Sequence, residues 1–151
     1  MRKLILVVVP AIALVFVAIS VMGAGAKGGG GKVRRVSVPH SDRFTPFGLT
    51  VRAGDTVKWI NHDSDDHTVV SDGAFDTAGH KSVNKRLDAN GGTVKLTFRH
   101  PGTYVYYCRF HARLDAKNQP VAPGPDGGIQ SNNGNFGTPM SGVVTVLPKK
   151  G

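Results

Sequence analysis

The sequence predicts an all-β protein with the architecture of a Greek-key antiparallel β-sandwich. Short segments that alternate apolar and polar side chains recur along the chain, which is typical of strands with one buried face. Glycine, proline, asparagine and aspartate separate these segments and favour tight turns. No stretch has the 3.6-residue period of a long amphipathic helix, so short strands are the main elements we expect.

The first element is an apolar segment at residues 4–21, which follows the basic pair Arg2 and Lys3 and precedes the small residues 24–26. This pattern predicts an apolar helix within residues 1–26. It is either a signal peptide that is removed on export or an uncleaved membrane anchor. In both cases the basic pair stays inside and the rest of the chain is exported, to the periplasm or another extracytoplasmic space.

A glycine-rich linker, KGGGGK at residues 27–32, separates this segment from a single domain expected at residues 33–148. The turn sequences Ala53-Gly54-Asp55 and Pro101-Gly102 lie between alternating segments. Residues 78–87 have poor periodicity and are interpreted as a place for a short helical turn. The strands we expect are residues 33–38, 49–51, 57–60, 69–70, 94–98, 103–107 and 143–147.

One long segment, residues 112–139, has no hydrophobic period and is rich in Pro, Gly, Asn and Gln. We interpret it as a loop inserted into the domain. Loops of this length in compact domains are uncommon and are usually functional or mobile. Its role is not predicted.

The single cysteine, Cys108, lies in the run YVYYCRFH, three residues before His111. A thiolate and an imidazole on one short loop supply half of a metal site. His67 and Met140 are candidates for the other half, and the resulting His, Cys, His and Met set is soft and suits copper. Metal ligation also explains an odd thiol in an exported protein. The alternatives are an inert buried cysteine and His62 in place of His67.

Around these residues the chain resembles the cupredoxins, the small blue-copper proteins that include plastocyanin, amicyanin and azurin. LTVRAGDTVKWIN (49–61) and HTVVS (67–71) resemble the strands that lead to and carry the first histidine ligand. TFRHPGTYVYYCRFH (97–111) is similar to the copper loop, and MSGVVTV (140–146) to the axial methionine with the last strand. Small cupredoxins have only a few residues where this chain has 112–139. A core methionine therefore remains the alternative for Met140.

The resemblance implies one copper ion per chain, cycling between Cu(I) and Cu(II), with His67, Cys108, His111 and Met140 as its ligands. It implies an exported one-electron carrier between extracytoplasmic or membrane redox partners, not an enzyme. The ring edge of His111 would be the electron port, and the residues that would form an apolar rim around it are Pro46, Phe47 and Phe110. Copper oxidases and nitrite reductases need HxH or HCH pairs, which this sequence lacks. Copper sequestration or delivery remains the alternative function.

The net charge of +9 suggests an acidic protein partner or the membrane face. No basic helix or nucleic-acid motif accompanies this charge, so nucleic acid is excluded as the expected partner. Asp63, Asp65 and Asp66 lack the glycine and final glutamate of a calcium loop and are interpreted as solvated loop charge. We expect the protein to be a monomer that associates with membranes, if at all, through residues 4–21.

Overall fold

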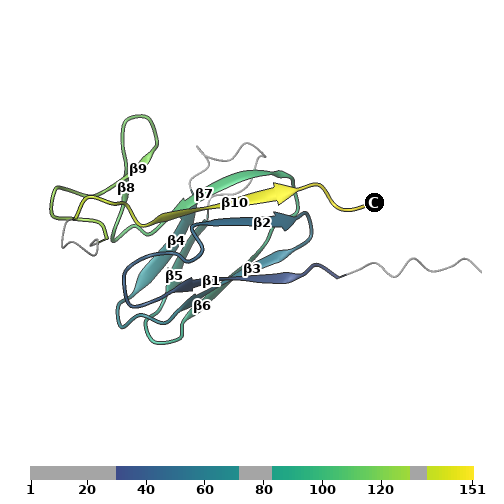
Figure 1. Ribbon diagram of the computed structural model, residues 1–151, viewed down its shortest axis with the longest axis horizontal. Helices are drawn as coiled ribbons and strands as arrows, with labels where there is room; N and C mark the ends of the chain where they lie inside the picture. Colours follow the sequence, from purple (N-terminus) through teal and green to yellow (C-terminus); the bar gives the residue numbers. More distant parts are fainter. Residues whose placement is uncertain (1–29, 72–82, 130–135) are drawn as a thin grey trace, which may run out of the picture.

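The computed structural model describes residues 30–71, 83–129 and 136–151, and in these ranges all regular structure is β (Figure 1). The all-β prediction is therefore confirmed, whereas the predicted N-terminal helix lies outside the described residues. Within the described ranges no helix is long and apolar enough to cross a membrane. The strands are β1 (Val33–Val38), β2 (Gly48–Arg52), β3 (Thr56–Asn61), β4 (His67–Ser71), β5 (Val83–Leu87), β6 (Thr93–Thr97), β7 (Gly102–Tyr107), β8 (Arg113–Leu114), β9 (Pro120–Val121) and β10 (Ser141–Leu147).

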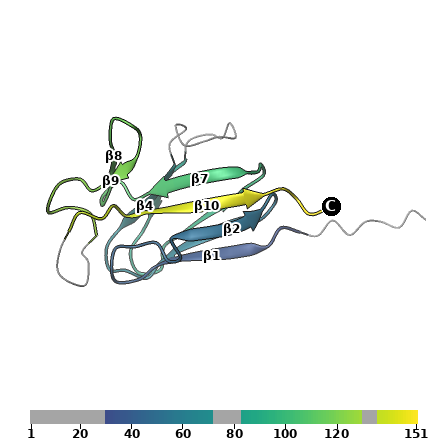
Figure 2. The ribbon, with the colours of Figure 1, turned by 45° about the horizontal axis from the view of Figure 1, so that its top comes forward.

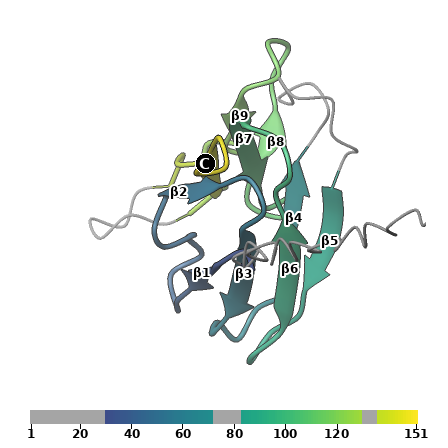
Figure 3. The same cartoon turned by 90° about the vertical axis from the view of Figure 1, so that its right-hand side faces the viewer.

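Two sheets form the layers of a sandwich (Figures 2 and 3). One has the order β1-β3-β6 and the other β2-β10-β7-β4-β5. The antiparallel prediction is correct for β3–β6, β4–β5, β4–β7 and β7–β10, but it is wrong for β1–β3 and β2–β10, which are parallel. The reason is that the chain repeatedly crosses from one sheet to the other, so strands that run in the same direction become neighbours.

The core lies between the inner faces of the two sheets. Along β3 and β10, buried side chains alternate with more exposed ones, as the period of two in a strand requires. Trp59 is the largest fully buried side chain, and its ring packs edge-on against Tyr106 at 5.3 Å between ring centroids. The other core residues are chiefly valines and aromatic residues: Val36, Val38, Phe44, Val51, Val57, Val69, Leu87, Val94, Phe98, Tyr104, Val144 and Val146.

The predicted helical turn is wrong for residues 83–87, which form strand β5 instead. This strand pairs antiparallel with β4, and Leu87 lies opposite His67. In β5 only Leu87 is fully buried, since the strand lies at the edge of its sheet. An edge strand with little buried surface does not need alternating apolar and polar residues. Its strand structure therefore depends on pairing with β4.

The inserted segment 112–139 also contains regular structure that its sequence did not predict. Strands β8 and β9 form a hairpin whose turn is organised by Asp115. The carboxylate Oδ1 of Asp115 accepts the backbone N–H groups of Lys117 and Gln119, each at 2.8 Å. A bridge between Ile129 and Thr138 joins the two sides of the segment nearer to Met140. Hydrogen bonds between the Asp115 side chain and the backbone therefore stabilise this hairpin, although its sequence has no hydrophobic period.

Candidate metal centre

The predicted ligands lie at one end of the sandwich, three of them at the ends of neighbouring strands and the fourth, His111, in the turn between β7 and β8. His67 is the first residue of β4, Cys108 follows the last residue of β7, and Met140 precedes the first residue of β10. Because β7 pairs antiparallel with both β4 and β10, the start of β4, the end of β7 and the start of β10 lie at the same end of the sheet. This end lies opposite the C-terminus (Figure 1).

Three donor atoms converge at this end. The Nδ1 atoms of His67 and His111 each lie 3.7 Å from Sγ of Cys108. One donor atom from each of the three residues lies within 4.8 Å of the others. A metal ion at about 2.0–2.1 Å from nitrogen and about 2.3 Å from sulfur, as in zinc sites, separates donors about 120° apart by about 3.7 Å. The two separations between sulfur and nitrogen therefore match those expected around a trigonal metal ion.

The sulfur of Cys108 is completely enclosed, yet its surroundings favour the thiolate. Burial on its own would raise the pKa of Cys108. The contacts from His111 and then His67, with backbone N–H groups of Thr68 and Phe110, outweigh burial and lower the pKa to about 5. The Thr68 N–H donates to Sγ at 3.4 Å. A thiolate ligand is thus already available at neutral pH.

The inserted segment leaves and re-enters the domain at the metal centre. The Met140 N–H donates to the carbonyl of His111 at 3.2 Å, and the Met140 carbonyl accepts the N–H of Cys108 at 2.9 Å. Met140 is buried in the same core cluster as Cys108. The length of residues 112–139 therefore does not move Met140 away from the loop that carries Cys108 and His111.

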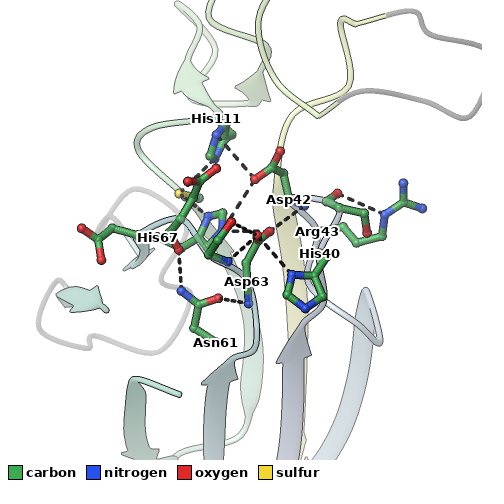
Figure 4. A network of polar contacts seen from close by, with 12 residues as sticks. His40, Asp42, Arg43, Asn61, Asp63, His67 and His111 are labelled. Atoms are coloured by element: carbon green, nitrogen blue, oxygen red, sulfur yellow. Dashed lines mark hydrogen bonds and ion pairs between the residues drawn. The ribbon is translucent and has the colours of Figure 1, made fainter. Parts of the chain in front are cut away.

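Two carboxylates that were not predicted as part of the site, Asp42 and Asp63, lie beside the histidine rings (Figure 4). Oδ1 of Asp42 lies 3.6 Å from Nε2 of His67 and 3.8 Å from Nε2 of His111. Oδ2 of Asp63 lies 3.6 Å from Nε2 of His67. The solvated interpretation is wrong for Asp63, which is only 6% exposed. His62, by contrast, is exposed and takes no part in the cluster of donors.

The loop before His67 is held by buried Asn61. Its side-chain Nδ2 donates to the carbonyl oxygens of Asp65 and Leu87, and its Oδ1 accepts the N–H of Asp63 at 2.9 Å. Burial disfavours ionised Asp63, but hydrogen bonds from the N–H groups of Ser64 and Asp42, together with His67, lower its pKa below the usual value. Asp63 is therefore a carboxylate that helps to shape this loop.

The predicted electron port and the predicted rim residues all have exposed surface. The His111 side chain is 23% exposed, whereas His67 is fully enclosed. Phe110, the neighbour of His111 in the chain, is about half exposed, and Phe47 is 62% exposed. Pro46, the third predicted rim residue, is also exposed.

Comparison with known proteins agrees with this description. The family described as "Copper binding proteins, plastocyanin/azurin family" matches residues 37–118, a range that includes His67, Cys108 and His111 but not Met140. Chloroplastic plastocyanin of Physcomitrium patens is 36% identical over 72 residues, which cover 45% of this chain and 43% of that protein. Plastocyanin of Ulva prolifera is 34% identical over 78 residues, which cover 49% of this chain and 80% of that protein. The chain thus spans less than half the length of the Physcomitrium patens protein.

Solved structures support the fold. A Cu(I) form of an amicyanin variant superposes with a TM-score of 0.51 at 22% identity, over 76% of this chain and 82% of that one. An oxidised amicyanin variant superposes with a TM-score of 0.50 at 23% identity, over 75% and 80%. These likenesses concern the arrangement of the strands.

Proposed function

The chain belongs to the plastocyanin/azurin family of copper-binding proteins, and from this premise we propose that it is an exported type 1 (blue) copper protein. It carries single electrons between extracytoplasmic or membrane redox partners and catalyses no reaction of its own. The observation that carries the proposal is the convergence of both histidine Nδ1 atoms on Sγ of Cys108 at 3.7 Å.

In this proposal Cys108 would hold a copper ion as thiolate, His67 and His111 would hold it through Nδ1, and Met140 would supply a weak thioether donor. When bound, a single copper ion supplies the one-electron couple between Cu(I) and Cu(II). The protein holds the donors on the ends of three hydrogen-bonded strands, so they move little when the charge of the site changes. Small movement is what fast electron transfer requires.

We propose that electrons pass through the partly exposed edge of His111, with Phe47 and Phe110 as the apolar contact surface for a partner. A row of cations supports an acidic partner. Arg35, Lys58 and Lys95 lie directly opposite one another across β1, β3 and β6. Like charges in such a row repel, so an anionic surface opposite them is favourable.

The remaining organisation is part of the same proposal. Residues 1–26 act as a signal peptide or membrane anchor, residues 27–32 as a linker, and residues 33–148 as the copper domain with its insertion at 112–139. The order of a basic pair, an apolar stretch and a small-residue site supports export.

Loading with Cu(II) tests the function directly. The protein is expected to develop an intense visible thiolate-to-copper charge-transfer band, which ascorbate bleaches and re-oxidation restores. Slow loss of copper to a chelator in both oxidation states is expected of a carrier, whereas rapid release would indicate copper delivery. A Cu(II)-loaded protein without a visible band would contradict the blue-copper assignment.

Substitution of the axial donor is expected to change the potential and not the colour. Met140→Leu conserves volume, so the fold should survive with a stability loss below about 1.5 kcal/mol. Loss of the thioether disfavours the higher oxidation state, and the reduction potential should rise by about 59 mV or more, which is tenfold in the equilibrium constant. Redox titration of the visible band measures the change. An unchanged potential in a folded variant would show that Met140 is only a core side chain.

A further inference from the structure

Asp42 lies beside both histidine donors and faces their Nε2 atoms, whereas their Nδ1 atoms face Sγ of Cys108 (Figure 4). Its Oδ1 lies 3.6 Å from Nε2 of His67 and 3.8 Å from Nε2 of His111. Among the described residues, few buried polar side-chain atoms lack a hydrogen-bond partner, and Oδ1 of Asp42 and Nε2 of His67 are two of them. Buried polar atoms are nearly always paired. Because these two unpaired atoms face each other, we interpret their contact as functional.

The position of the proton on each histidine ring explains this contact. A neutral imidazole that binds a metal through Nδ1 carries its proton on Nε2. Both Nε2–H groups then point toward the carboxylate of Asp42. The present separations exceed an ordinary N–H···O hydrogen bond by about 0.6–0.9 Å, so a small movement of one side chain completes the contact.

The scaffold favours this placement of Asp42. Asp42 has a φ of 49°, the left-handed conformation that aspartate and asparagine tolerate better than most residues. Its N–H faces Oδ2 of Asp63 at 3.5 Å. The base of its loop is closed by paired backbone hydrogen bonds between Ser37 and Thr45, each 2.8 Å long. A turn with these constraints presents its side chain in one direction.

We propose that Asp42 is a positioning residue that serves both histidine donors at once, an inference that rests on the copper function proposed above. Its carboxylate holds His67 and His111 in the tautomer with a free Nδ1 lone pair and increases their basicity. Its negative charge favours a 2+ ion over a 1+ ion in the site. Asp42 therefore strengthens the binding of divalent metals and lowers the reduction potential of copper.

Asp63 has a different part. It contacts only His67 of the two histidine donors, and its other oxygen accepts the N–H of Ser64 at 2.7 Å, which fixes its position within its own loop.

Asp65 supplies a matched control for charge. The contact with Cys108, and then the charges of Asp42 and Asp65, raise the pKa of His111 against the effect of burial, and the side chain of Asp65 is exposed. Removing the charge of Asp42 or of Asp65 alters the electric field at the site, but of the carboxylates in the described ranges only Asp42 faces both Nε2 atoms.

The test compares Asp42→Asn with Asp65→Asn in the full chain, using Co(II) as a redox-inactive probe and then copper. Asp42→Asn is expected to weaken Co(II) binding by about 10- to 100-fold and to raise the copper potential. Asp65→Asn is expected to change the affinity by less than about threefold. Asp42→Gly, which suits the same backbone conformation, should match Asp42→Asn, and Asp42→Glu should restore part of the affinity.

The outcomes separate this inference from the proposed function. Equal effects of Asp42→Asn and Asp65→Asn would overturn the inference, because net charge alone would then explain the change. Wild-type affinity in Asp42→Asn and Asp42→Gly would also overturn it. If the wild-type protein binds neither Co(II) nor Cu(II) through Cys108, the proposed function itself fails. Thermal unfolding of the metal-free variants confirms that each is folded before metal is added.

Discussion

Cys108→Ser is expected to abolish the intense visible band of the Cu(II)-loaded protein. The band requires charge transfer from a thiolate, and a serine hydroxyl is neither soft nor ionised at neutral pH. In the wild-type protein the contacts around Cys108 lower its pKa to about 5, so the thiolate predominates before metal binds. Spectra of both proteins at equal copper and protein concentrations provide the measurement.

The control for this substitution is Val144→Ser. Val144 is fully buried in β10 and is not one of the predicted ligands, so the variant also buries a hydroxyl but leaves all four predicted ligands in place. We expect Val144→Ser to keep the band as long as it is folded. A band of wild-type intensity in Cys108→Ser would remove Cys108 from the metal centre.

Trp59→Ala is expected to lower the free energy of unfolding of the metal-free protein by about 3–5 kcal/mol. Trp59 is 1% exposed, and its ring contacts Tyr106 at 5.3 Å and Phe98 at 6.5 Å between centroids. Truncation leaves a cavity between the two sheets that neighbouring aromatic rings fill only in part. Since a small domain is stabilised by only about 5–15 kcal/mol, this variant should be marginally stable. Urea unfolding followed by far-ultraviolet circular dichroism measures the loss.

Phe47→Ala is the matched control, because it also removes an aromatic ring but from a side chain that is 62% exposed. Its stability should stay within about 0.5 kcal/mol of the wild-type value. A loss below about 1 kcal/mol in Trp59→Ala would mean that Trp59 is not central to the core.

Much of the fold was predictable from local sequence. In β3 and β10 every second residue is buried, and most of these residues are apolar, so the strands appear directly as alternation in the sequence. Strand β5 and the hairpin of β8 and β9 bury little apolar surface, so they leave no such alternation. Their structure depends on backbone pairing and on the side chain of Asp115.

By itself, the sequence determined the kind of chemistry. One thiol with a histidine three residues later, a second histidine and one late methionine define a soft donor set, and donor type is a property of the residues themselves. Only the tertiary structure decided which groups surround those donors. Asp42 lies in the loop between β1 and β2, and Asp63 lies in the loop between β3 and β4. Both carboxylates face His67. Contacts between residues far apart in the chain have no local period, so only the tertiary structure shows which carboxylates lie beside the histidines.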